Sequence, residues 1–131
     1  MSDVNGQPPG ARRVIRSVHD LDVYRLAFEA AMEVFEISKG FPPEEKYSLT
    51  DQMRRSSRSV AGNIREGFAK RRYRPVFCRH LTDAHGSGEE TRTWLDFALA
   101  CKYVAADVHE RISDKYDRIS AMLHRMIEHW T

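Results

Sequence analysis

One segment in the middle of the chain decides the fold: LTDQMRRSSRSVAGNIREG, at residues 49–67. Its apolar residues recur at spacings of four, seven and four residues, and therefore share one side of a helix. They are Leu49, Met53, Val60 and Ile64. Serine, alanine and glycine fill much of the remainder, and such small side chains let the backbone of another helix come close. The segment predicts an amphipathic helix that ends near Gly67 and packs closely against a neighbour.

Three further stretches show helical periodicity. Before the central segment, Leu21–Lys39 carries an apolar stripe at 4-3-4-3 spacing and is followed by Gly40 and two prolines, which end a helix. After it come Pro75–Val104 and a last stretch from Asp107 to the end of the chain. No segment alternates at period two for long enough to form a strand. We therefore predict an all-α protein, an antiparallel up-and-down four-helix bundle.

The sequence also predicts where three helices begin and whether the third helix is continuous. Capping residues are expected to start the helices: Asp20 for the first, Ser48 with Asp51 for the second, and Asp107 with Glu110 for the fourth. Gly86-Ser87-Gly88 interrupts the third stretch, at a cost of about 2 kcal/mol against alanine. Either that helix breaks there, or the glycines face the small residues of 49–67 at a close crossing. The apolar period continues in phase, which favours the crossing.

The length and composition point to one domain. The chain has 131 residues, of which 41% are hydrophobic, enough for a single core. We expect residues 1–19 to form a mobile tail and residues 20–131 to form the bundle. No apolar run is long enough for a membrane span and no signal peptide is visible, so we expect a cytoplasmic protein without membrane contact. Cys78 and Cys101 are expected to be small buried hydrophobes in a reducing compartment.

Positive charge is concentrated in one part of the sequence. Between Arg54 and Arg79 there are nine basic residues and a single acid, Glu66, although the whole chain carries only +2. Arginine presents a planar fork of donors that matches phosphate, and an exposed tyrosine can stack on a base. The candidate nucleic-acid-binding residues are Arg54, Arg55, Arg58, Arg65, Lys70, Arg71, Arg72, Tyr73 and Arg74. The alternative is that these arginines pair with acids of neighbouring helices or of other subunits.

A second set of polar residues shares one helix face. Arg55, Ser59, Asn63 and Glu66 follow 4-4-3 spacing. Glu66 is the only acid among the bases and has a ready arginine partner, while Glu90 on the next helix is another acid for the same set. We interpret these residues as a structural polar network that fixes helix register or subunit packing.

Signals for catalysis and metal binding are weak. The six histidines include no Glu-x-x-His, the motif that di-iron bundles use. His85 with Glu89 and His124 with Glu128 have i, i+4 spacing and could share a metal, but such pairs arise often by chance. No P-loop, nucleophile elbow or dinucleotide fingerprint is present. We expect a non-enzymatic protein without a metal or another cofactor.

The segment at 49–67 resembles a family signature, L-x-x-Q-x-R-R-(small)-(small)-x-S-I/V-x-x-N-I-x-E-G. This signature belongs to four-helix-bundle proteins encoded in intervening sequences of 23S ribosomal RNA genes. Phe41-Pro42 followed by Glu45-Lys46-Tyr47 resembles the family's FP-x-x-E-x-Y/F loop. Ala84-His85-Gly86-Ser87 with Glu90-Thr91 resembles its A-x-G-S-x-x-E-T/L segment. The resemblance extends from about Leu21 to Trp130.

This resemblance implies an assembly and a class of ligand. The family is similar to the accessory variability protein of diversity-generating retroelements, which acts with a reverse transcriptase and binds nucleic acid through a basic surface. Its members tend to form homopentameric rings, so the expected partners are further copies of this chain and RNA or DNA. Two hypotheses follow. One is a homo-oligomer that binds nucleic-acid phosphates. The other is a protein-interaction module whose first and last helices present apolar stripes and whose arginines make intersubunit ion pairs.

Overall fold

The four predicted helices are present and pack antiparallel as a bundle. The structure is a computed structural model and describes residues 14–131. The helices are α1 (Asp22–Ser38), α2 (Leu49–Ala69), α3 (Arg74–Ala100) and α4 (Ala106–Trp130), with short 3-10 helices η2 (Val18–Asp20) and η3 (Pro43–Glu45). No strand occurs in the described part of the chain. The prediction of an all-α four-helix bundle is confirmed.

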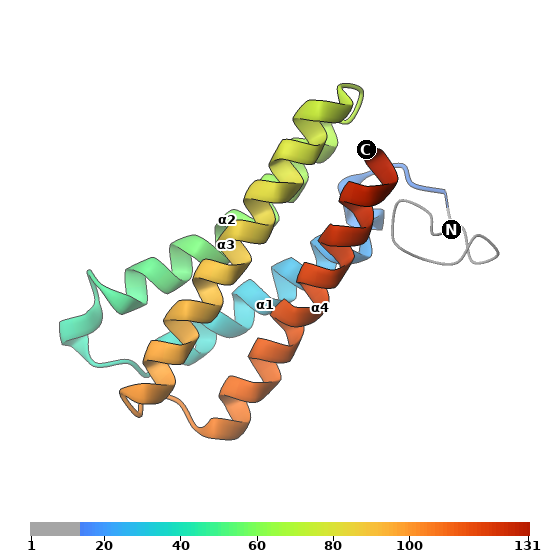
Figure 1. Ribbon diagram of the computed structural model, residues 1–131. Helices are drawn as coiled ribbons and strands as arrows, with labels where there is room; N and C mark the ends of the chain where they lie inside the picture. The colour runs from blue at the N-terminus through green and yellow to red at the C-terminus, as the bar shows by residue number, and fades with distance from the viewer. Residues whose placement is uncertain (1–13) are drawn as a thin grey trace.

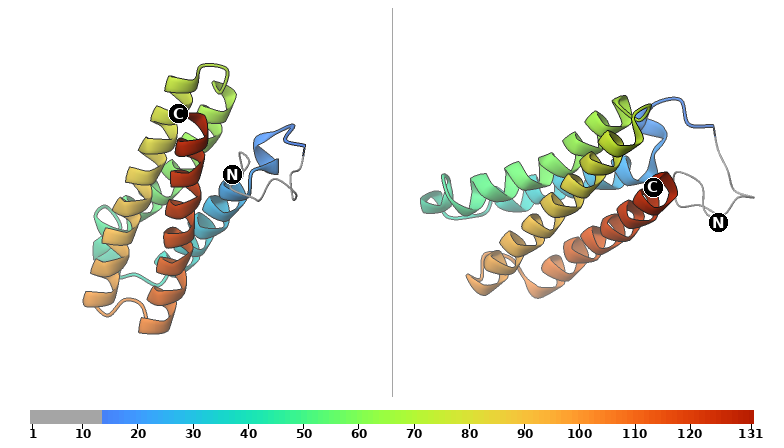
Figure 2. Two further views of the ribbon diagram at one scale, coloured as in Figure 1. Left: turned by 45° about the vertical axis from the view of Figure 1, so that its right-hand side comes forward. Right: turned by 45° about the horizontal axis from the view of Figure 1, so that its top comes forward.

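The helices α2 and α3 form a long hairpin that organises the molecule. They pack against each other more extensively than any other pair, and α4 packs against α3 and α1. The hairpin is tightest near its turn and diverges toward the other end (Figure 1 and Figure 2). The α2–α3 turn lies at the same end as the C-terminus, while the α1–α2 and α3–α4 connections lie at the opposite end (Figure 1).

One core joins all four helices. Its largest fully buried side chains include Val23 from α1, Ile64 from α2, Leu81 from α3 and Leu123 from α4. Burying such a side chain contributes about 1.5–3 kcal/mol to folding, so the predicted apolar stripes are what hold the helices together. Within residues 14–131, no helix is both long enough and apolar enough to cross a membrane.

Glycines mark where α3 meets its neighbours. The helix runs without a break through Gly86-Ser87-Gly88, as the continuing period predicted. Only Gly88 faces other helices: a β-carbon there would lie 3.6 Å from Tyr116 Cδ1 and 3.9 Å from Val60 Cγ2, whereas Gly86 has open space around it. The contact with α3 is tighter at Gly67, where an added β-carbon would lie 2.7 Å from His80 Cβ.

Of the three predicted helix caps, only Ser48 occupies the predicted position, and none of the three makes a side-chain cap hydrogen bond. Asp20 lies in η2, where its carboxylate accepts the backbone N–H groups of Arg16 and Ser17. Ser48 is the N-cap of α2, but its hydroxyl donates to Glu45 Oε1 at 2.6 Å and caps no helix N–H. The charged carboxylate is the stronger acceptor for that hydroxyl. The fourth helix begins one residue before Asp107 and has no side-chain cap.

The described residues include the end of the segment expected to form the tail. The expected tail, residues 1–19, overlaps η2, in which Val18 is buried against the core, and Ile15 is also packed against it. The remainder of the expected tail, residues 1–13, lies outside the described residues.

The two cysteines differ in exposure. Cys78 in α3 is half-buried, and burial raises the pKa of its thiol. Cys101, the residue that follows α3, is exposed. The prediction of two buried thiols is therefore wrong for Cys101.

Candidate nucleic-acid interface

The tight α2–α3 turn presents a cluster of cations at one end of the bundle. Residues 70–74, here called the turn cluster, are all exposed. The backbone N–H of Tyr73 donates to Lys70 O at 2.9 Å, which closes the turn. Pro75 follows in the first turn of α3, where its missing N–H costs nothing. These five exposed residues therefore lie on a tight turn at the end of the α2–α3 helix pair (Figure 1).

Aromatic rings hold two of the turn arginines. The Arg71 guanidinium lies 3.9 Å from the Phe68 ring centroid, and its Nη1 donates to Phe68 O at 2.9 Å. Arg74 lies 5.9 Å from the Trp130 ring, which belongs to α4. Arg72 makes no hydrogen bond or ion pair with residues 14–131. Stacking fixes a guanidinium without neutralising its charge, so most donors of these side chains face solvent.

A second group of arginines follows α2 where it packs on α1. This group, here called the groove arginines, shares one helix face at spacings of four and seven residues. Its members are Arg54, Arg58 and Arg65. Arg54 and Arg58 lie 4.8 and 5.7 Å from the same ring, that of Phe35. Arg54 Nε also donates to Ser38 Oγ at 2.8 Å, and Arg65 Nη1 donates to the Tyr24 hydroxyl at 3.4 Å. Their contacts on α1 are aromatic rings and hydroxyls.

Carboxylate partners are few on this surface. Arg55 pairs with Asp51 at 3.7 Å on its own helix, and Lys70 pairs with Glu66 at 3.4 Å, also on its own helix. Within the described chain, none of the predicted basic residues forms an ion pair with another helix. The alternative that acids of neighbouring helices in the same bundle pair with the arginines is therefore not supported for the described residues.

The predicted polar network forms in part. Asn63 Nδ2 donates to the backbone oxygen of Ser59 at 3.0 Å and to its hydroxyl at 3.1 Å, and Glu66 Oε2 lies 3.3 Å from the ring of His80. Arg55 and Glu90 do not join this network. Arg55 is exposed, and Glu90 accepts from Trp94 Nε1 at 3.4 Å.

Sequence reasoning missed two members of the network on α3. The Ser59 and Ser87 hydroxyls lie 2.9 Å apart, and Asn63 Oδ1 lies 3.3 Å from His80 Nδ1. In each pair the midpoint between the two residue numbers lies within about two residues of Tyr73, the position of the turn. Pairing across an antiparallel hairpin requires this. The turn position could therefore have identified both partners. Glu66 has a lysine and a histidine as partners, where an arginine was predicted.

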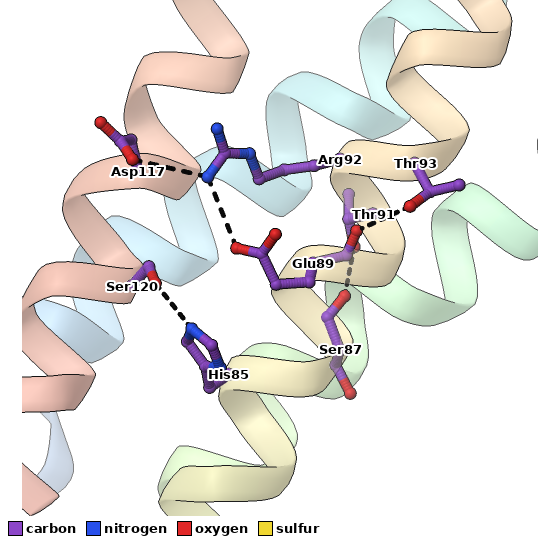
Figure 3. A network of polar contacts seen from close by, with 8 residues as sticks. All are labelled: His85, Ser87, Glu89, Thr91, Arg92, Thr93, Asp117 and Ser120. Carbon is purple, nitrogen blue, oxygen red and sulfur yellow. Dashed lines mark hydrogen bonds and ion pairs between the residues drawn. The ribbon is translucent and has the colours of Figure 1, made fainter.

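The histidine–acid pairs considered for metal binding have other partners or are isolated. His85 Nε2 lies 2.7 Å from Ser120 Oγ on α4, and Glu89 pairs with Arg92, which also reaches Asp117 (Figure 3). His124 and Glu128 form an exposed pair at 3.0 Å. In the part of the chain that the structure describes, no cluster of three or more His, Cys, Asp or Glu residues could hold a metal.

Two apolar surfaces lie away from the turn cluster. A groove of about 390 Å³, here called the apolar groove, opens between the start of α2 and the end of α3. Its apolar lining includes Trp94, Phe97 and Tyr47, and Tyr47 is 85% exposed.

The second surface, the α1 patch, consists of Phe28 and Met32, which are both about half exposed. Large exposed apolar side chains are thus present on α1, as predicted, but absent from α4, which is described in full.

Beside the apolar groove, a hydrogen bond ties two connections together. The Tyr103 hydroxyl donates to Glu45 Oε2 at 2.8 Å. Hydrogen bonds from Ser48 and from Tyr103 lower the pKa of Glu45. The same bond to Glu45 raises the pKa of Tyr103 to about 12.

Comparison with known proteins places this bundle in a family. No curated protein matches the chain. A crystal structure of a protein of unknown function from the S23 ribosomal protein family of Bacteroides thetaiotaomicron VPI-5482 superposes with a TM-score of 0.74 at 26% identity. The match covers 81% of this chain and 98% of that chain. A model of the 23S rRNA-intervening sequence protein family matches residues 19–125. The chain therefore belongs to the 23S rRNA-intervening sequence protein family.

Proposed function

We propose that this protein is a non-enzymatic binder of nucleic-acid phosphates, and that the turn cluster and the groove arginines form its binding surface. One observation carries the proposal: six of the predicted arginines have no carboxylate partner within residues 14–131. They are Arg54, Arg58, Arg65, Arg71, Arg72 and Arg74. The role agrees with the one implied by the resemblance to the accessory variability protein.

The arrangement suits an extended polyanion. From Arg54 to Arg65 the groove arginines follow one face of α2 for roughly 16 Å. Rings under Arg54, Arg58 and Arg71 restrict these side chains before any ligand arrives, which reduces the entropy lost on binding. Tyr73 is exposed and could stack on an unpaired base. The phosphates are common to RNA and DNA, so this surface is proposed to bind both.

Fluorescence anisotropy tests the proposal. A structured RNA and a DNA of matched length and structure are each titrated with the protein at 50 and 200 mM salt. If six or more phosphates are contacted, the affinity should fall by about 10³ or more between the two conditions. Absence of binding at 50 mM salt would contradict the proposal.

Self-assembly is a second candidate function, favoured by the two exposed apolar surfaces. The apolar groove and the α1 patch lie on different elements, and neither is covered within residues 14–131. If the α1 patch of one copy fills the groove of the next, the contact is heterologous, and such contacts form a ring when the rotation between subunits closes. A homopentameric ring would repeat the basic surface around an axis. In such a ring the arginines could instead make intersubunit ion pairs.

Light scattering on two variants tests this assembly. Phe28→Glu with Met32→Glu removes the α1 patch, and Tyr47→Glu with Phe97→Glu removes the apolar groove. Each variant alone should be monomeric. An equimolar mixture should form a dimer, because one intact patch and one intact groove remain. A monomeric wild-type protein at micromolar concentration, or a mixture that stays monomeric, would contradict the heterologous contact.

A further inference from the structure

His80 lies between two hydrogen-bond acceptors in the α2–α3 hairpin. Its Nδ1 lies 3.3 Å from Asn63 Oδ1, and its Nε2 lies 3.3 Å from Glu66 Oε2. The residue is only 8% exposed. Its Nε2 is buried without a hydrogen bond of good geometry in the described structure. The ring therefore has an acceptor at each nitrogen and is largely shielded from water.

The orientation of Asn63 fixes which nitrogen carries a proton. Its Nδ2 donates twice to Ser59, so its Oδ1 is the atom that faces His80. Only an N–H at Nδ1 can satisfy this oxygen. In a neutral imidazole the other nitrogen, Nε2, then has a lone pair that points at the Glu66 carboxylate. Only the doubly protonated ring can donate to both acceptors.

The same carboxylate oxygen also binds a member of the turn cluster. Lys70 Nζ lies 3.4 Å from Glu66 Oε2, the atom that faces His80 Nε2. Both Lys70 and Glu66 are about half exposed, so their ion pair is readily exchanged. Glu66 is thus shared between a buried ring that can gain a proton and an exposed cation of the proposed binding surface.

We propose that His80 is a positioning residue that makes nucleic-acid binding proton-linked. The protonated ring holds Glu66 and releases Lys70 to a phosphate, whereas the neutral ring repels Glu66 and leaves it paired with Lys70. The proposal rests on the proposed function of the turn cluster. It adds a regulation: acid strengthens binding through one additional phosphate contact.

The charged surroundings of His80 support a single partner. From α2, Glu66 faces the ring directly, and Lys70 pairs with the same carboxylate oxygen. Among residues 14–131, no carboxylate of α1, α3 or α4 lies within 4 Å of the ring nitrogens. Glu66 is therefore the one carboxylate of the described chain that pairs directly with this ring.

The test measures the salt dependence of RNA binding at pH 6 and pH 8, a range in which histidine ordinarily changes charge. For the wild-type protein the slope of log K against log salt should be steeper at pH 6 by about 0.7–0.9, the value for one more phosphate. His80→Gln should abolish this difference. Glu66→Gln, at an exposed site, should give the steeper slope at both pH values because Lys70 is then free. His109→Gln is the matched control, since His109 of α4 pairs with Asp96, near the C-terminal end of α3, at 2.8 Å and should leave the difference intact.

A pH-independent slope in the wild-type protein, or an unchanged pH effect in Glu66→Gln, would overturn the inference while leaving the proposed function in place. Failure of nucleic acid to bind at either pH would instead remove the proposed function. In that case NMR of the free protein still tests whether His80 and Glu66 are coupled. The carboxyl ¹³C chemical shift of Glu66 should change as His80 gains a proton, and this change should be lost in His80→Gln. A Glu66 resonance that does not respond to His80 would overturn the inference.

Discussion

The Tyr103 hydroxyl donates a hydrogen bond of 2.8 Å to Glu45 Oε2 and so ties the α3–α4 connection to the α1–α2 connection. These connections are 58 residues apart in the sequence. The bond closes the end of the bundle opposite the turn cluster, and it changes the titration of both residues.

Tyr103→Phe should lower stability in a pH-dependent way. The lowered pKa of Glu45 means that its contribution is present above the ordinary carboxyl range and is lost as pH falls through it. The pKa of Tyr103, raised to about 12, means that its contribution is present below about pH 10 and is lost between about 10 and 12. Urea midpoints of the wild type and the variant should therefore differ most between about pH 6 and 9. A difference that is constant from acid to alkaline pH would contradict this account.

Two glycines of α2 should respond oppositely to alanine. At Gly67 the new β-carbon would lie 2.7 Å from His80 Cβ, an atom fixed to the α3 backbone, so the helices must separate. Gly67→Ala should therefore destabilise the protein by about 1–3 kcal/mol. Gly62→Ala is the matched control: nothing lies within 4 Å, and alanine should stabilise the helix by about 1 kcal/mol. Chemical denaturation measures both, and equal effects would refute the close crossing at Gly67.

Removing the ring under the groove arginines should weaken nucleic-acid binding without changing charge. Phe35→Leu leaves Arg54 and Arg58 in place but abolishes the stacking that orders them. Each side chain that is no longer ordered before binding costs about 0.5–1.5 kcal/mol of conformational entropy, so the affinity should fall several-fold. Phe41→Leu is the control, because its ring stacks on Tyr103 and carries no arginine. Identical affinities for the two variants would show that the groove arginines do not bind.

The two thiols should differ in reactivity. Cys101 is exposed, whereas Cys78 is half-buried and burial raises the pKa of its thiol, which reduces the reactive thiolate. At pH 8 iodoacetamide should therefore modify Cys101 several times faster than Cys78. Peptide mass spectrometry over a time course measures both rates, with Cys101→Ser as the control for the slower site. Equal rates would contradict the packing around Cys78.

The helices could be predicted from the sequence because burial dictates them. Apolar residues at 4-3 spacing must face a common core, and residues such as Val34 and Leu95 do so with no exposed surface. The continuity of α3 followed from the same period on both sides of Gly86-Ser87-Gly88.

The helix caps and the polar partners could not be predicted with the same rule. Local spacing correctly placed Ser48 at the N-cap of α2. Its hydroxyl, however, donates a hydrogen bond to Glu45, which η3 brings within reach, and caps no helix N–H. His80 and Ser87 meet α2 only once the register of the hairpin is known, and that register depends on the turn at Tyr73. Side-chain hydrogen bonds depend on such distances, whereas apolar burial depends only on which face a residue occupies.

A matched charge reversal tests the central claim most directly. Arg71→Glu, Arg72→Glu and Arg74→Glu together reverse the turn cluster. Arg111→Glu, Arg118→Glu and Arg125→Glu reverse three exposed arginines of α4 at seven-residue spacing, with the same change in net charge. At 50 mM salt the turn variant should lose RNA binding measured by anisotropy, while the α4 variant should retain most of it. Equal losses in the two variants, or full binding by the turn variant, would contradict the assignment of the turn cluster as the nucleic-acid surface.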